Sequence, residues 1–153
     1  MVAQITEGVK VSVETTYQPE YSNPANEHFM FAYKIRIENL GNYSVQLMSR
    51  HWDIFDSNGT TRVVEGEGVV GLQPIIEPGR THEYVSGCNL KTDIGNMKGT
   101  YLMKRLVDDE LFLCANGRMI NKSINIPSND PEIKATTKAS QYEFPDIIKF
   151  DAM

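Results

Sequence analysis

Cysteine is scarce in this chain, which has only Cys88 and Cys114 among its 153 residues. Two isolated cysteines cannot form the dense disulfide framework that stabilises small secreted domains. They also lack the paired C-x-x-C spacing that is typical of a structural zinc site. The cysteine content therefore argues against a disulfide scaffold and favours an intracellular compartment.

Long apolar runs are lacking as well. No stretch approaches the roughly 18 consecutive apolar residues of a membrane-spanning helix. The first ten residues, MVAQITEGVK, have no charged segment followed by the apolar core of a secretory signal. We therefore expect a soluble, cytoplasmic protein that does not insert into a membrane.

Positive charge is sparse and scattered. Fifteen Lys and Arg residues oppose twenty Asp and Glu residues, which gives a formal net charge of -5. The basic residues stand singly, apart from the pair Lys104 and Arg105. Domains that bind nucleic acid usually gather Lys and Arg in a stripe that neutralises phosphates. The sequence therefore predicts no nucleic-acid partner.

Alternation of apolar and polar residues is what the chain has in abundance, and this period of two is typical of half-buried β-strands. With 41% apolar residues in 153, the chain is long enough for one buried core, so we expect a single globular domain. The clearest strand lies in HFMFAYKIRIEN. Its apolar residues of one parity are Phe29, Phe31, Tyr33, Ile35 and Ile37.

Turn motifs separate the expected strands at intervals of about ten residues, which favours an all-β sandwich. These motifs lie at residues 39–42, 56–59, 77–80 and 108–109. In the segment between the first two, Val45 and Leu47 have one parity whereas Trp52 and Ile54 have the other. A β-bulge near Ser49 would return all four side chains to one face.

A glycine-rich loop follows this segment. Gly66, Gly68 and Gly71 have the spacing G-x-G-x-x-G, which in dinucleotide-binding folds joins a strand to a helix whose N-terminus faces the pyrophosphate. Here two prolines in residues 73–79 leave no room for a helix, and Glu65 and Glu67 would repel phosphate. We therefore interpret the glycines as permitting tight turns. Weak phosphate contact through loop amides remains the alternative.

Four segments, in this order and spacing, resemble the ApaG domain family. They are SRHWDIFDSNG (49–59), VVEGEGVVGLQP (63–74), PGRTHEYVSGCNL (78–90) and GNMKGTYLM (95–103). The likeness covers roughly residues 5–113. It implies a fold like that of immunoglobulin and fibronectin type III domains, a β-sandwich of two antiparallel sheets, which agrees with the strand pattern.

The resemblance implies less about function. Bacterial members are named as cobalt and magnesium efflux proteins, and eukaryotic relatives carry similar domains as interaction modules. The family offers no catalytic residues to carry over. We therefore expect a non-catalytic module that binds a protein partner and acts indirectly in cobalt and magnesium homeostasis. The alternative is a phosphate-containing metabolite bound at the loop of residues 66–71.

Residues suited to metal or acid–base chemistry show no supporting pattern. His28, His51 and His82 lack an i,i+2 or i,i+4 partner of ligating type, so structural roles are expected for all three. The acidic residues around the glycine loop and at 108–110 are typical of a solvated face. No ordering of Ser, His and Asp supports a nucleophile. We expect no metal site, no cofactor and no enzymatic activity.

Arg50 interrupts an apolar strand and has two interpretations. In the first, it lies on the wet face with its stem over apolar surface, while Trp52 fills the core between the sheets. In the second, Arg50 and His51 join the glycine loop in one exposed patch for an acidic or phosphorylated ligand. The candidate ligand-binding residues are therefore Gly66, Gly68, Gly71, Arg50 and His51.

The C-terminal part departs from the family pattern. We expect the final strand at residues 123–127, which would make residues 113–122 an insertion. The domain would then span residues 1–127. Residues 128–153 would form a tail whose few apolar residues predict poor order. Should this final strand fail to pair, it would leave a sheet edge open to a partner or to a second copy of the chain, as a homodimer.

Overall fold

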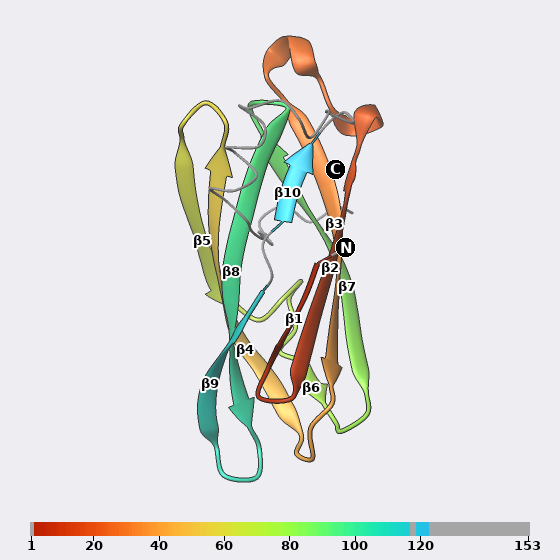
Figure 1. The fold of residues 1–153 in the computed structure, drawn as a ribbon, viewed down its shortest axis with the longest axis vertical. Helices are drawn as coiled ribbons and strands as arrows, with labels where there is room; N and C mark the ends of the chain where they lie inside the picture. The colour runs from red at the N-terminus through yellow and green to blue at the C-terminus, as the bar shows by residue number, and fades with distance from the viewer. Residues whose placement is uncertain (1, 117–118, 123–153) are drawn as a thin grey trace.

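The computed structural model describes residues 2–116 and 119–122, which form strands joined by turns (Figure 1). The strands are β1 (Val2–Thr6), β2 (Val9–Tyr17), β3 (Phe29–Asn39), β4 (Val45–Asp56), β5 (Thr61–Glu67), β6 (Ile75–Ile76), β7 (Thr81–Leu90), β8 (Ile94–Arg105), β9 (Glu110–Ala115) and β10 (Met119–Lys122). Two short 3₁₀ turns, η1 (Pro19–Tyr21) and η2 (Pro24–Asn26), lie between β2 and β3.

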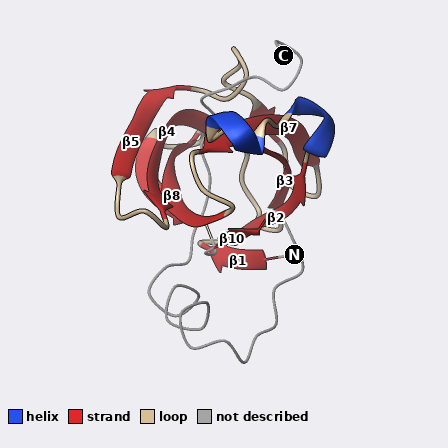
Figure 2. Cartoon of the chain, turned by 90° about the horizontal axis from the view of Figure 1, so that it is seen from above, coloured by secondary structure: helices blue, strands red, loops and turns tan. Residues whose placement is uncertain are grey.

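The strands form two antiparallel sheets that face each other. One sheet has the order β1-β2-β3-β7, and the other has the order β10-β8-β4-β5, with β6 paired to β4 and β9 paired to β8. Seen from above, β5, β4 and β8 lie opposite β7, β3 and β2 (Figure 2). The predicted two-sheet antiparallel β-sandwich is confirmed.

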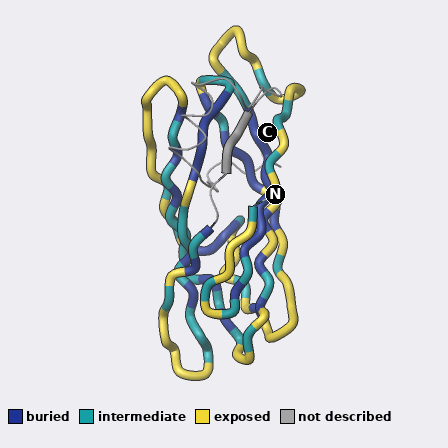
Figure 3. The backbone as a smooth tube through the Cα atoms, viewed as in Figure 1, coloured by how far each residue is buried: buried dark blue, intermediate teal, exposed yellow. Residues whose placement is uncertain are grey.

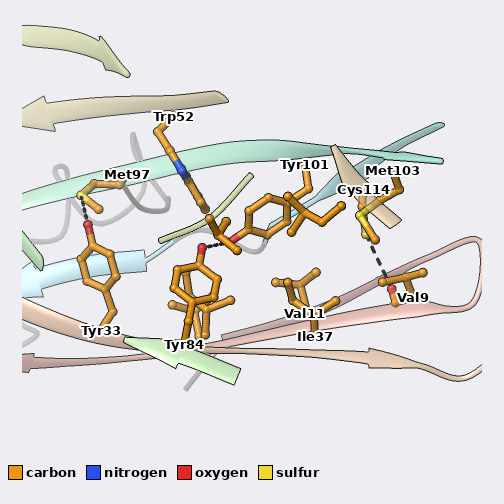
Figure 4. Close-up of a cluster of buried hydrophobic side chains, with 14 of the residues drawn as sticks. Val9, Val11, Tyr33, Ile37, Trp52, Tyr84, Met97, Tyr101, Met103 and Cys114 are labelled. Atoms are coloured by element: carbon orange, nitrogen blue, oxygen red, sulfur yellow. Dashed lines mark hydrogen bonds between the residues drawn. The ribbon is translucent and has the colours of Figure 1, made fainter. Parts of the chain in front are cut away.

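The core lies between the sheets and is built from alternate residues of each strand. Trp52 is fully buried, and its ring meets the ring of Tyr101 edge-on at 5.4 Å between centroids (Figure 4). The hydroxyls of Tyr84 on β7 and Tyr101 on β8 share a hydrogen bond that joins the two sheets. The expected core position of Trp52 is therefore confirmed, and polar atoms in the core are used to link its two halves.

The expected bulge in β4 is confirmed. The register between β4 and β8 shifts between Leu47 and Ser49. Because of the extra residue, Met48, the side chains of Leu47, Trp52 and Ile54 all reach the core. Arg50 lies two residues before Trp52, after the bulge, and therefore shares its face of the strand.

Two segments differ from the sequence-based expectation. β1 was not expected, because its apolar residues Val2 and Ile5 differ in parity; it pairs with β2 through a hairpin turn at Glu7 and Gly8, both with positive φ. β8 begins at Ile94, a start that the alternation of apolar and polar residues does not predict. Residues such as Gly and Asn disfavour strands, but pairing with β4 and β10 overrides that preference here.

Most of the predictions for the C-terminal part concern residues that the structure does not describe. β9 and β10 lie within the expected insertion at 113–122 or reach into it, and both pair with β8. The expected final strand at 123–127, the domain boundary at 127 and the tail at 128–153 lie outside the described residues.

Exposed residues gather at the hairpin turns and along β5, whereas the middle stretches of the long strands are buried (Figure 3). No helix within residues 2–116 and 119–122 is long and apolar enough to cross a membrane.

Candidate functional site

β5 is the last strand of its sheet, and no described strand pairs with its outer side (Figure 1). Five of its seven residues are exposed, and 58% of Val63 is accessible to solvent. An exposed strand edge presents unpaired backbone N–H and C=O groups, to which another chain can pair. We therefore take the β5 edge and its surroundings as the candidate site.

The hydrogen bonds at the two ends of β5 show which of its backbone groups are open. The N–H of Asp56 donates to the carbonyl of Thr60, and the N–H of Gly68 donates to the carbonyl of Met48, each at 2.9 Å. In an antiparallel pair the bonded residues alternate. The continuous register between these two bonds therefore directs the even-numbered residues of β5 toward β4. The backbone groups of Thr61, Val63 and Glu65 point away from the sheet.

Arg50 closes one end of this open edge. Its Nη1 donates hydrogen bonds to the carbonyl oxygens of Glu67 and Gly68, at 3.0 and 2.9 Å. Gly66, the β5 partner of Arg50, makes this possible, because a Cβ on Gly66 would lie 2.8 Å from Nη1 and Nη2 of Arg50. Arg50 thus lies on the inward face beside the core and binds the loop backbone. This position differs from the first interpretation, which placed Arg50 on the solvent-exposed face.

The glycine loop turns back on itself. Val69 and Leu72 exchange two backbone hydrogen bonds, at 2.8 and 3.0 Å, across a turn in which Val70 and Gly71 both have positive φ. Gly68 also has positive φ, and its N–H is bonded to the β4 bulge. Several loop amides that an anion would need are therefore engaged within the fold, and no helix follows them.

His51 lies on the opposite face of β4 from Arg50. Its Nδ1 is 2.6 Å from Oε1 of Glu65, and its Nε2 is 3.4 Å from Oδ1 of Asp53. The structure therefore brings Arg50 together with Gly66 and Gly68, and it places His51 with two carboxylates on the outer surface. Among the described residues, no group of three or more His, Cys, Asp and Glu side chains is placed to hold a metal ion.

The other two histidines lie away from this edge. Nδ1 of His28 is 3.4 Å from Nδ2 of Asn89, and His82 in β7 stacks at a tilt against Tyr84, with 6.3 Å between ring centroids. Partial burial lowers the pKa of His82 below its usual value. Both are consistent with structural roles.

Arg62 marks the other end of the open edge, and sequence reasoning missed it. Its Nη2 donates to the carbonyl of Asn89 at 2.7 Å and to Sγ of Cys88 at 3.3 Å, so it ties β5 to β7 across the gap between the sheets. Burial raises the pKa of the Cys88 thiol to about 11. An isolated arginine in an alternating segment gives no sign of this contact.

Comparison with known proteins identifies a family and relatives of this chain. The ApaG domain family matches residues 19–105. Protein ApaG of Anaeromyxobacter dehalogenans (strain 2CP-C) is 50% identical over 105 residues, which cover 69% of this chain and 82% of that protein. Protein ApaG of Pseudomonas paraeruginosa (strain DSM 24068 / PA7) is 53% identical over 95 residues, which cover 62% of this chain and 75% of that protein. These relatives are named without an enzymatic activity.

A solved structure extends the likeness to the fold. The putative ApaA protein from Bordetella pertussis has a TM-score of 0.74 and 40% sequence identity, and the match covers 77% of this chain and 95% of that chain. The family match includes β3 to β8, and with them the open edge, Arg50 and the glycine loop. On the family match and on relatives at about half identity, the chain belongs to the ApaG domain family.

Proposed function

We propose that this domain is a non-catalytic module that binds a partner protein by adding one of the partner's strands to β5. The observation that carries the proposal is the open edge, where the backbone groups of Thr61, Val63 and Glu65 point away from the sheet and are exposed. An extended segment can bond to such groups whatever its sequence, and its side chains then supply specificity.

The surroundings of the edge favour the binding of a short partner segment of defined length. Val63 offers an apolar contact on the outer face, and Glu65 lies beside it next to His51. Arg50 already binds the outward carbonyl of Glu67, so pairing stops there. A partner strand would therefore cover about five residues, close to the usual length of a short strand.

The metabolite alternative has weaker support. The N–H groups of Gly68, Val69 and Leu72 donate within the fold, and the Arg50 guanidinium binds loop carbonyls. A phosphate group would have to displace these bonds. In our proposal, a role in cobalt and magnesium homeostasis is exerted through the bound partner.

A proline at position 63 tests the proposal. The N–H of Val63 points outward, so Val63→Pro removes a donor for the added strand without removing a bond to β4. Val63→Ala is the matched control, because it shortens the same side chain and keeps the N–H. The probe is a library of eight-residue synthetic peptides with free C-termini. The peptides that bind the full chain are selected from this library. Peptide binding is expected to survive in Val63→Ala and to fall at least about tenfold in Val63→Pro.

The site of binding is read from amide chemical shifts of the ¹⁵N-labelled protein. Selected peptides should shift the amides of Thr61, Val63 and Glu65. Thermal unfolding of both variants confirms that each is folded. Selected peptides that bind Val63→Pro as tightly as the original chain would refute strand addition at β5.

A further inference from the structure

A cavity of about 250 Å³ opens at the start of β5, between the β4–β5 hairpin and the end of β7. It is lined by Ile54, Asp56, Thr60, Thr61, Arg62, Asn89, Leu90 and Lys91. It therefore lies beside Thr61, the first residue of the open edge. Neither the strand edge nor the glycine loop accounts for it.

Arg62 is held in this cavity with donors to spare. Its Nη2 is fixed by the carbonyl of Asn89 and by Sγ of Cys88, whereas its Nε and Nη1 make no hydrogen bond to any described residue. A guanidinium anchored at one nitrogen has its side-chain entropy already reduced, and its remaining N–H groups match the two oxygens of a carboxylate.

The other charges of the cavity add to this preference. No described carboxylate forms an ion pair with the ammonium group of Lys91. The carboxylate of Asp56 is buried. It accepts hydrogen bonds from the backbone N–H of Lys91, at 2.7 Å, and from the Thr92 hydroxyl. Its oxygens are thus engaged within the fold. Two cations against one engaged carboxylate leave the cavity suited to an anion.

The direction of an added strand follows from these charges. A segment antiparallel to β5 would begin near Glu67 and end beside Thr61, next to Arg62 and Lys91. Its amino-terminal part would meet the carboxylates of Glu65 and Glu67, and its last residue would meet the two cations. A parallel segment would instead place its amino-terminal part beside the two cations and its last residue beside the carboxylates. Antiparallel pairing is also the more favourable ladder.

We propose that the segment bound by this domain is the free C-terminus of a partner chain, whose terminal carboxylate is received by Arg62 and Lys91. This inference rests on the proposed function, because it names the partner segment that the β5 edge takes. The backbone of the segment pairs with Thr61, Val63 and Glu65. The carboxylate then sets both the register and the direction of the strand.

Amidation of the peptide tests the inference. Each peptide selected from the free-acid library is synthesised again with a C-terminal amide, which removes the charge and leaves the rest unchanged. On the original chain, the amide form is expected to bind at least about tenfold more weakly, the effect of losing a charge-assisted hydrogen bond. In Arg62→Gln, the two forms should differ by less than about twofold.

Two variants control for fold and charge. Lys91→Gln leaves the contacts of Arg62 with β7 intact and should reduce the effect of amidation without altering the fold. Arg80→Gln removes one positive charge at the far end of β7 and should leave the effect of amidation unchanged.

The outcomes separate the two proposals. If selected peptides shift the β5 amides but amidation changes nothing, the carboxylate inference is wrong and strand addition stands. If amidation weakens binding equally in the original chain, Arg62→Gln and Lys91→Gln, the carboxylate is bound elsewhere and the inference is again wrong. If no selected peptide shifts the β5 amides, the proposed function itself fails.

Discussion

Three glycines in one loop have three different physical reasons to be glycine. A Cβ on Gly66 would meet the guanidinium of Arg50, whereas a Cβ on Gly68 would meet the carbonyl oxygen of Leu72. Gly71 has a φ of +77° but nothing within 4 Å of where its Cβ would lie. The G-x-G-x-x-G spacing thus reflects packing at two positions and backbone conformation at Gly68 and Gly71.

Alanine at Gly68 and at Gly71 separates these effects. Both residues have positive φ, so each substitution costs about 1 kcal/mol of unfolding free energy for the left-handed backbone. Gly68→Ala should cost at least about 2 kcal/mol more, because its Cβ must displace the backbone at Leu72. Urea unfolding measures both. Equal losses would mean that the loop relaxes freely around position 68.

The residues of the candidate site were only partly predictable. Arg50 stood out because it interrupts an apolar strand, but its bonds to Glu67 and Gly68 depend on the register of β4 with β5. Arg62 depends on a contact between two sheets. Neither register nor sheet packing is encoded in local alternation, so these partners could not be deduced from spacing.

At the scale of the strand, β5 should show alternating protection from hydrogen exchange. The N–H groups of Arg62, Val64 and Gly66 donate toward β4, whereas those of Thr61, Val63 and Glu65 point outward. The outward set should exchange almost as fast as in an unfolded chain, and the inward set should be protected. Exchange measured by NMR on the free protein checks this. Uniform protection across β5 would show that something already covers the edge.

Strands with strict alternation were the ones that sequence reasoning found. β3 was expected from one parity of apolar residues, and the β4 bulge was expected from a change of parity. β1 and the first five residues of β8, from Ile94 to Lys98, lack such alternation. They form strands because neighbours on the sheet supply the pairing, and that information is not local.

At the scale of the whole molecule, the two free thiols report on one shared core. Cys88 lies in β7 and Cys114 in β9, on different sheets, and both are fully buried. Burial raises the pKa of Cys88 to about 11 and that of Cys114 to about 12. Both should therefore resist Ellman's reagent at about pH 8 in the folded protein and react only on unfolding.

The reaction is followed against urea in the variants Cys88→Ala and Cys114→Ala, which leave one thiol each. A single midpoint, shared with the fluorescence of Trp52, is expected if both sheets unfold together. Different midpoints for the two thiols would show that the sheets unfold separately.

The shortness of the open stretch in β5 also bears on how copies of this protein behave toward each other. A long bare edge invites chains to stack strand upon strand into fibres. Here Arg50 occupies the carbonyl of Glu67, so only Thr61, Val63 and Glu65 remain for a neighbour to pair with. Two copies that paired through their β5 edges would gain a ladder of only these residues. If β5 binds a short foreign segment as proposed, the same shortness protects this edge against polymerisation.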